Sequence, residues 1–306
     1  MMLEKPQTDS QVAPRATLEK HRQAIDRELL KELSKHEDTA FHFPLKNATK
    51  GGRRLRPILL ILAHKTIKEK ATKAFPAAIA VELAHLESLI HDDIIDRDAE
   101  RRKSASFHVL HGYEMAILSA DYILSIILKL TSRYKDPRIP QTLAEATAKM
   151  GEGELEEFRI SDGSQNMTLD KYLEIVEKKT AALFQASATI GAIIAGANSK
   201  ETNALADYGR LLGTAYQIQD DIADLNKKTR INILTLLGNP EISMDQLRTT
   251  SRNRIENAKR SIGKLKECKA KRLLMELAES IASPSVGDIQ GSVTHSKKES
   301  DRERMG

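Results

Sequence analysis

Two copies of the pattern Asp-Asp-x-x-Asp are the residues of this 306-residue chain best suited to chemistry. The six side chains are Asp92, Asp93 and Asp96 in HDDIIDRD, and Asp220, Asp221 and Asp224 in QDDIADL. Residues four apart share one face of a helix, so Asp92 and Asp96 project together, as do Asp220 and Asp224. Apolar residues flank both copies and draw the carboxylates toward the interior, where unpaired charge is costly. The alternative, acids simply solvated on a helix surface, is disfavoured by these flanks.

Oxygen donors without sulfur or paired histidines favour a hard divalent cation. The single cysteine, Cys268, is too few for an intrachain disulfide or a cysteine-based zinc cluster. Mg²⁺ accepts one or two carboxylates and completes its coordination with substrate phosphates and water. Two aspartate clusters facing each other across a helix bundle therefore predict several Mg²⁺ ions around a diphosphate.

Cationic side chains accompany the acidic pattern. The string GGRRLRP places Arg53, Arg54 and Arg56 at a helix start, where backbone N–H groups also favour anions. It is not a nucleotide-binding P-loop, because GxxxxGK[ST] is absent. His85 precedes Asp92 by two helical turns on nearly the same face, although a lone histidine on a helix is more often structural. Further candidates are Arg101, Arg102, Lys179 and Thr180.

Long helices must position these residues. The chain is 40% hydrophobic and 30% charged, and no proline lies between Pro76 and Pro137 or between Pro140 and Pro240. Short alternating runs of Val, Ile and Thr are lacking, which favours an all-α protein. Helices are predicted at 17–36, 56–70, 74–98, 113–133, 140–158, 168–196, 201–225, 241–263 and 266–282, with connectors at 41–53 and 161–166.

The organisation predicted along the chain is a single large helical domain over residues 15–282. A flexible segment is expected at 1–14, and a disordered tail at 283–306, which lacks apolar content. The longest strongly apolar run, residues 122–128, falls far short of the roughly 20 residues of a transmembrane helix. The first twenty residues lack the apolar centre of a signal sequence. We therefore expect a cytoplasmic protein with no transmembrane segment.

The net charge of +5 invites a nucleic-acid partner, but its distribution argues against one. Residues 252–272 hold nine Lys or Arg against two Glu, so the basic character is local. Apolar residues in this segment follow helical spacing, which indicates the solvated face of a packed helix. A nucleic-acid or anionic-membrane surface is the alternative, weakened by the absence of Trp and of interleaved aromatics. We predict no nucleic-acid partner.

The motifs, in this order, resemble the all-trans isoprenyl diphosphate synthases, also called polyprenyl synthetases. The resemblance covers most of residues 45–240 and rests on GGRRLRP, ELAHLESLIHDDIIDRDAERRKSASFH, ILSADYILS, EKKTAALF and GTAYQIQDDIADL. It implies a homodimer of about ten helices around a central cavity. The implied reaction is Mg²⁺-dependent, head-to-tail condensation of isopentenyl diphosphate with an allylic diphosphate, which releases diphosphate.

The resemblance also implies roles for individual residues. Those implied for isopentenyl diphosphate are Arg53, Arg56, His85 and Arg102. Three Mg²⁺ ions bridged from Asp92, Asp96 and Asp220 are implied to hold the allylic diphosphate. The residues that assist are Arg101, Lys179, Thr180 and Gln217, and Asp93, Asp221 and Asp224 complete the clusters.

The chemistry requires a dry cavity, because the carbocation left by C–O cleavage must meet an alkene before it meets water. Residues expected to line it are Leu89, Ile90, Ile94, Leu183, Phe184 and Ile218. Product length in this family is set by side chains just before the first aspartate motif. The residues there, Val81, Ala84, Glu87 and Ser88, include no aromatic ring. We therefore expect geranylgeranyl diphosphate, with a longer prenyl chain as the alternative and a floor formed by Tyr113, Met115 and Tyr122.

The chain departs from the family pattern in three places. GGRR replaces GGKR, and RRKSASFH replaces RRGxPTxH. The lysine-rich loop after the second motif is shortened to DLNKKTRINILTLLGNP, with Leu234 where a lysine is expected. Two alternatives follow: Lys227, Lys228 or Arg230 replaces the missing cations, or the loop supplies none.

Three rival interpretations remain. A class I terpene cyclase has similar metal chemistry but lacks the isopentenyl site that GGRRLRP implies. A non-catalytic subunit of a heteromeric synthase is supported only by the shortened loop. A helical nucleic-acid-binding protein is supported only by residues 252–272.

Overall fold

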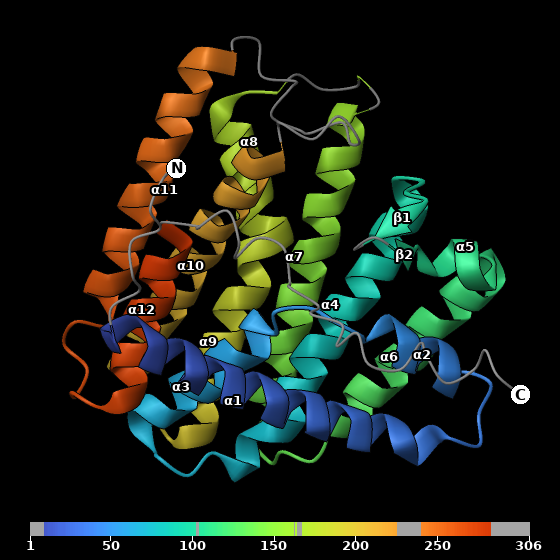
Figure 1. Cartoon of the computed structure of the whole chain (residues 1–306), viewed down its shortest axis with the longest axis horizontal. Coiled ribbons are helices and arrows are strands. Elements are labelled where there is room, and N and C mark those ends of the chain that lie inside the picture. The colour runs from blue at the N-terminus through green and yellow to red at the C-terminus, as the bar shows by residue number, and fades with distance from the viewer. Residues whose placement is uncertain (1–8, 102–103, 162, 164–166, 225–239, 283–306) are drawn as a thin grey trace, which may run out of the picture.

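The computed structural model describes residues 9–101, 104–161, 163, 167–224 and 240–282, and these form a bundle of helices (Figure 1). Side chains are described from residue 16 in the first helix and from residue 244 in α11. The elements are α1 (Asp9–Leu33), α2 (His42–Ala48), α3 (Leu55–Ile67), α4 (Phe75–Ile95), β1 (Glu100–Arg101), β2 (Ser104–Ala105), α5 (Phe107–His111), α6 (Tyr113–Thr131), α7 (Arg138–Ser161), α8 (Leu169–Val176), a π-helical segment (Glu177–Ala181), α9 (Ala182–Ala195), α10 (Ser199–Asp224), α11 (Pro240–Ser261) and α12 (Lys269–Ala282).

Helix α9 lies at the centre of the bundle and packs against α3, α7 and α10 (Figure 1). Its sequence, ALFQASATIGAIIA, is apolar around nearly the whole helix, which is typical of a helix covered on all sides. Close approach of α10 depends on Gly213, since a Cβ there would lie 2.8 Å from the Ala181 Cα and the Phe184 Cβ. Helix α10 is therefore in near backbone contact with the π-helical segment and the start of α9, about two turns before the second aspartate cluster.

Helix α4 carries the first aspartate cluster and packs mainly against α6 and α3. Pro76 lies in its first turn, where a missing N–H costs nothing. The stretch from Ala77 to Ala84 is buried, so this half of the helix anchors the motif in the core. The helix ends at Ile95, and the next residue but one, Arg97, has φ +55° and turns the chain toward the β1–β2 hairpin.

The all-α prediction is confirmed, and most predicted helices match observed ones within a few residues. The predicted helix 168–196 is divided, because the π-helical segment separates α8 from α9. Helix α2 lies inside the predicted connector 41–53; its proline, Pro44, is in the first turn, where proline is tolerated. The hairpin and α5 were not predicted either.

The two ends of the chain compare differently with the prediction. Helix α1 starts at Asp9, so residues 9–14 are helical where a flexible segment is predicted. The predicted tail 283–306 and the loop 225–239, with Lys227, Lys228 and Arg230, lie outside the described residues. Of the helices that the structure describes, none is both long and apolar enough to span a membrane.

The basic segment near the C-terminus packs as predicted. Ile255, Ala258 and Ile262 are buried in the core, with exposures of 0–2%. One basic side chain is an exception to the solvated face: Lys271 is buried and donates to the carbonyl oxygens of Gly263 and Leu265. It therefore caps the turn that follows α11.

Candidate active site

Both aspartate clusters line one cavity of about 3660 Å³, bordered by α4, α6, α7, the π-helical segment and α10. Every predicted site residue that the structure describes borders it. These residues are Arg53, Arg56, His85, Asp92, Asp93, Asp96, Arg101, Lys179, Thr180, Gln217, Asp220, Asp221 and Asp224. Arg102 lies outside the described residues. The fold thus joins two clusters that are 128 positions apart in sequence at a common site.

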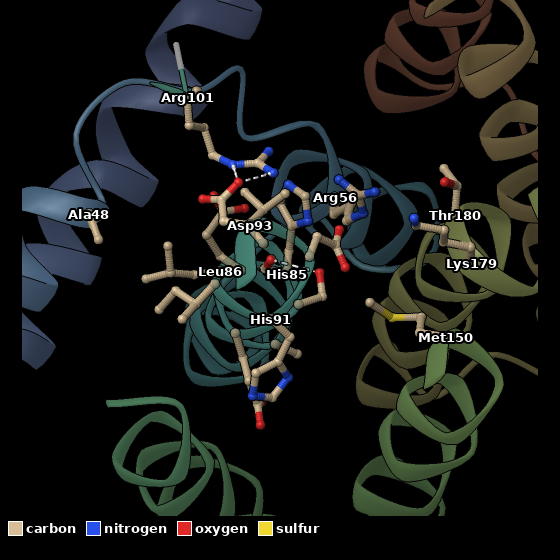
Figure 2. Close-up of a pocket in the computed structure, with 18 of the residues that line it drawn as sticks. Ala48, Arg56, His85, Leu86, His91, Asp93, Arg101, Met150, Lys179 and Thr180 are labelled. Carbon is tan, nitrogen blue, oxygen red and sulfur yellow. Dashed lines mark hydrogen bonds and ion pairs between the residues drawn. The ribbon is translucent and has the colours of Figure 1, made fainter. Parts of the chain in front are cut away.

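The aspartates of the first cluster have different surroundings. Asp93 is 2% exposed, and its Oδ1 accepts from the Arg101 Nε at 2.6 Å (Figure 2). The hairpin presents Arg101 for this contact, so Asp93 fixes the hairpin to α4. Burial raises the pKa of Asp92, while the positive charges of Lys179 and Arg101 oppose that rise. Asp92 is therefore a desolvated carboxylate that a further cation would stabilise.

Lys179 projects into the cavity from the π-helical segment, on the other side from Asp93 (Figure 2). Its Nζ lies 2.6 Å from the Glu154 Oε2 and 2.8 Å from the Glu157 Oε2, both on α7. Burial alone would lower the pKa of Lys179, but the carboxylates of Glu157, Asp92 and Glu154 raise it. Sequence reasoning missed both glutamates; the run GEGELEE was the available signal.

A chain of hydrogen bonds fixes the second cluster. The Thr180 Oγ1 donates to the Gln217 Oε1 at 2.9 Å, and the Gln217 Nε2 donates to the Asp221 Oδ1 at 2.8 Å. The Tyr172 hydroxyl, fully buried, donates to the Asp221 Oδ2 at 2.7 Å. Burial raises the pKa of Asp221 to about 7 despite these hydrogen bonds. Asp221 therefore connects α8, the π-helical segment and α10, and Tyr172 is a third residue that sequence reasoning missed.

The three arginines of GGRRLRP have separate environments. Arg53 contacts the Tyr216 hydroxyl, and its Nη2 lies 3.9 Å from the Asp220 Oδ1. Arg56 stacks on the Phe184 ring at 4.7 Å, and its buried Nε has no hydrogen-bond partner among the described residues. An unpaired buried donor at a cavity wall suits an anionic ligand.

Arg54 is structural instead. It is 7% exposed, and it donates to the Glu82 Oε1 at 2.6 Å, the Asp26 Oδ1 at 2.8 Å and the Thr49 carbonyl oxygen. Its backbone has φ +54°, the left-handed conformation that starts α3 and places Arg53 and Arg56 on the cavity side. The motif therefore combines one internal anchor with two cavity-facing cations.

The predicted hydrocarbon wall needs correction. Leu89 and Ile90 line the cavity, but Ile94, Leu183, Phe184 and Ile218 do not; the last three are fully buried in the core. The predicted floor of Tyr113, Met115 and Tyr122 is also wrong, since none of them lines the cavity. Tyr122 instead stacks on Phe41 at 4.4 Å. Besides Leu89 and Ile90 of α4, the apolar wall includes residues of α6 and α7, namely Leu124, Ile127, Leu128, Leu143, Ala144, Met150, Leu155 and Phe158.

Three of the four predicted positions before the first aspartate motif contribute to this wall. Ala84, Glu87 and Ser88 line the cavity, whereas Val81 is buried in the core. Burial, with a contribution from the Asp121 charge, raises the pKa of Glu87 to about 7. Near neutral pH this side chain is therefore partly uncharged, which suits an apolar wall better than a carboxylate does.

The carboxylates suit a metal ion that is shared with a ligand. Within the described residues, no three His, Cys, Asp or Glu side chains are grouped so that they could hold a metal ion by themselves. The side chains of both aspartate motifs offer oxygen donors only, and the buried Asp92 would gain from a cation. This donor set fits Mg²⁺, which takes one or two protein carboxylates and leaves its other positions for phosphate oxygens and water.

Comparison with known proteins gives a consistent set of relatives. The model of the polyprenyl synthetase family matches residues 39–232. A short chain isoprenyl diphosphate synthase of Methanocaldococcus jannaschii is 37% identical over 66% of this chain and 62% of its own length, so the match spans less than two thirds of that relative. A geranylgeranyl diphosphate synthase of Methanosarcina mazei is 32% identical over 76% of this chain and 86% of its own. An octaprenyl diphosphate synthase of Haemophilus influenzae is 32% identical over 59% of this chain and 54% of its own length.

Solved structures extend the similarity to the fold. A geranylgeranyl pyrophosphate synthetase from Pyrococcus horikoshii has a TM-score of 0.81 over 90% of this chain and 100% of its own, at 24% identity. Another from Geoglobus acetivorans has a TM-score of 0.76 over 87% and 99%, at 28% identity. The first of these shows the fold alone.

The two neighbouring arginines should respond differently to substitution. Arg54→Ala should lower the free energy of unfolding by about 3 kcal/mol, because it leaves the buried Glu82 carboxylate unpaired. Arg53→Ala should lower it by less than about 1 kcal/mol, since this side chain is 42% exposed. Urea denaturation of both variants measures the difference, and equal losses would contradict the division of roles within the motif.

Proposed function

Because this chain belongs to the polyprenyl synthetase family, we propose that it joins isopentenyl diphosphate to an allylic diphosphate, head to tail, and releases diphosphate. The chain is a prenyltransferase of that family. One observation carries the proposal: the two aspartate clusters line a single cavity together with Arg53, Arg56 and Lys179. Acidic side chains for metal and basic side chains for phosphate are what two diphosphate substrates require.

In this proposal Asp92, Asp96 and Asp220 hold Mg²⁺ at the diphosphate of the allylic substrate, and Asp93, Asp221 and Asp224 complete the two clusters. Bound Mg²⁺ supplies Lewis-acid stabilisation of the negative charge that develops on the departing diphosphate. Lys179, Arg101 and Gln217 face the same diphosphate as hydrogen-bond donors, and Thr180 assists by orienting Gln217. Arg101 already pairs with Asp93, so it is held in place before substrate arrives.

The isopentenyl diphosphate is assigned to the cations at the start of α3 and on α4. Arg53, Arg56 and His85 line the cavity, and His85 lies beside Arg56 in the close-up view (Figure 2). The buried Nε of Arg56 has no hydrogen-bond partner among the described residues, and a phosphate oxygen of the bound substrate would accept from it. Arg102, outside the described residues, is assigned here by the family resemblance. The proton lost after condensation is assigned to the released diphosphate.

Apolar side chains on α4, α6 and α7 protect the carbocation from water. The lining of α7 extends from Glu157 to Pro140, about 25 Å at 1.5 Å per residue. An extended prenyl unit is about one helical turn long, roughly 5 Å. This length accommodates the four units of a geranylgeranyl chain and about one more, and Ala84 and Ser88 place no ring across the path. We favour geranylgeranyl diphosphate as the product and retain a longer prenyl diphosphate as the second candidate.

We also propose that the chain acts as a homodimer. Large apolar side chains on α5, α6 and α7 are 44–59% exposed, an extent that indicates a protein interface. They are Val109, Leu110, Tyr113, Ile117, Leu118, Leu124, Leu128, Leu155 and Phe158. Five of them, Leu110, Leu124, Leu128, Leu155 and Phe158, also line the cavity, so a second copy would close its open side. Sedimentation equilibrium should give twice the chain mass at micromolar concentration; a monomer under assay conditions would contradict this assembly.

The activity is tested with labelled isopentenyl diphosphate and dimethylallyl, geranyl or farnesyl diphosphate, with Mg²⁺ or with EDTA. We expect elongation that EDTA abolishes. Asp92→Asn and Asp220→Asn should each lower kcat by about 100-fold or more, as loss of a metal-dependent charge stabilisation does. Asp245→Asn is the matched control, since its carboxylate on α11 is 88% exposed. No elongation with any primer and Mg²⁺ would reject the proposal in favour of a non-catalytic subunit, and elongation in EDTA would reject the metal assignment.

The product length is tested by filling the cavity beside α4. Ser88→Phe should shorten the main product by one or more prenyl units, because a ring would then project into the tail's path about one turn beyond Asp92. Ser132→Phe, at the exposed end of α6, is the control and should leave the product profile unchanged. Chromatography of the dephosphorylated products measures both, and an unaltered profile for Ser88→Phe would contradict the assigned tail path.

A further inference from the structure

We propose that Glu154 and Glu157 are positioning residues that clamp the Lys179 ammonium at the cavity wall, ready to meet the allylic diphosphate. We call these two glutamates the acidic clamp. The inference rests on the proposed function for the identity of the ligand, but its geometry does not depend on that function. The clamp would fix where Lys179 points before any substrate binds.

The contacts that define the clamp are short and converge on one atom. The Lys179 Nζ lies 2.6 Å from the Glu154 Oε2 and 2.8 Å from the Glu157 Oε2. The side chains involved are only 14–27% exposed, so solvent screens these ion pairs less than it screens surface pairs. An ammonium has three N–H donors. One of them donates to the Glu157 Oε2, and the Glu154 Oε2 forms an ion pair with the same nitrogen, so at least one donor remains for a ligand oxygen in the cavity.

The clamp also keeps Lys179 charged. Burial disfavours a protonated lysine, and a neutral amine would be a poor partner for a diphosphate. Here the carboxylates of Glu157, Asp92 and Glu154 outweigh burial and raise the pKa of Lys179. A free lysine side chain has about 2 kcal/mol of rotamer entropy. Because the clamp restricts the side chain beforehand, less of that entropy is lost when the ligand binds.

The backbone around Lys179 is arranged for the same contact. Lys179 belongs to the π-helical segment Glu177–Ala181, whose wider turn changes the direction in which side chains leave the helix. Helix α7 approaches this segment at Gly153, where a Cβ would lie 2.7 Å from the Lys179 backbone nitrogen. A larger residue would force the helices apart and lengthen both ion pairs. The close approach therefore lets two short glutamate side chains reach one ammonium.

A third glutamate of α7 provides an internal comparison. Glu156 contacts Lys178 at 2.6 Å and Lys171 at 3.0 Å, so it joins α7 to the same region of the chain through the same number of ion pairs. Glu154 and Glu157 share a helix face because they are three residues apart, whereas Glu156 projects from another face. Glu156 ties the helices together without contacting Lys179. Replacing Glu156 therefore removes ion pairs between the same segments without changing the contacts of Lys179.

The experiment compares Glu154→Gln, Glu157→Gln and the double variant with the control Glu156→Gln. The double variant should raise the KM for the allylic diphosphate about 10-fold and change the KM for isopentenyl diphosphate less than 2-fold. Glu156→Gln should leave both KM values within 2-fold of those of the native chain, even if its thermal stability falls as much as that of the double variant. Glu157→Asp, which keeps the charge, should recover part of the loss. An unchanged allylic KM, or equal increases for both substrates, would overturn the proposal.

A second arm tests whether the clamp acts through Lys179. In a Lys179→Ala background, adding Glu154→Gln and Glu157→Gln should have no further effect on the allylic KM. A further loss of the same size as in the native background would mean that the glutamates contact the metal or the substrate directly, and it would overturn a positioning role.

A third arm remains informative if the proposed function fails. Calorimetry with inorganic pyrophosphate and Mg²⁺ should show about 10-fold weaker binding for the double variant than for Glu156→Gln. Absence of turnover by the native chain would reject the prenyltransferase proposal, whereas equal pyrophosphate affinity of these two variants would reject the clamp.

Discussion

The structure depends on confining several like charges in one partly dehydrated cavity. Burial raises the pKa of Asp92, Glu154 and Asp221, so each carboxylate has lost hydration that its neighbours only partly replace. Mutual repulsion acts to separate α4, α7 and α10. The apolar core around α9 opposes this separation, and Lys179 and Arg101 supply positive charge between the acids. Such an arrangement favours cation binding, since a divalent ion would neutralise the negative charge that Lys179 and Arg101 leave unbalanced.

Adjacent residues of each motif divide the work between anchoring and binding. Asp93 is buried and holds the hairpin through Arg101, while Asp92 faces Lys179 across the cavity. Arg54 is bound inside by Glu82 and Asp26, while Arg53 lies near Asp220. On α4, neighbouring residues point about 100° apart, so Asp92 and Asp93 cannot share a surface. Before α3, the left-handed backbone of Arg54 separates its side chain from that of Arg53. In each pair of adjacent like charges, one side chain therefore forms ion pairs inside the protein and the other faces the cavity.

The cavity wall links the chemistry to the assembly. The part next to the aspartates is polar and is formed by α4, α10, the π-helical segment and Glu154 and Glu157 of α7, whereas the part formed by α6 and by Leu143, Ala144 and Met150 of α7 is largely apolar. Several of those apolar side chains remain half exposed in one copy. Water that reached the cavity through an open wall would react with the carbocation before the alkene did. The interface proposed for a second copy and the hydrophobic path proposed for the product are therefore one surface.

Sequence alone determined the helices, the two aspartate clusters and their placement on helix faces. These features depend on local periodicity, propensity and spacing of three or four residues, all of which are legible in a single chain. The relation of Lys179 to Glu154 and Glu157, the pairing of Arg101 with Asp93 and the hydrogen bond from Tyr172 to Asp221 were decided by tertiary structure. The same is true of the apolar wall, where Leu183 and Ile218 are in the core and α6 and α7 line the cavity. Which face of a helix meets which neighbour depends on packing between distant segments and on the π-helical turn, and no local pattern specifies either.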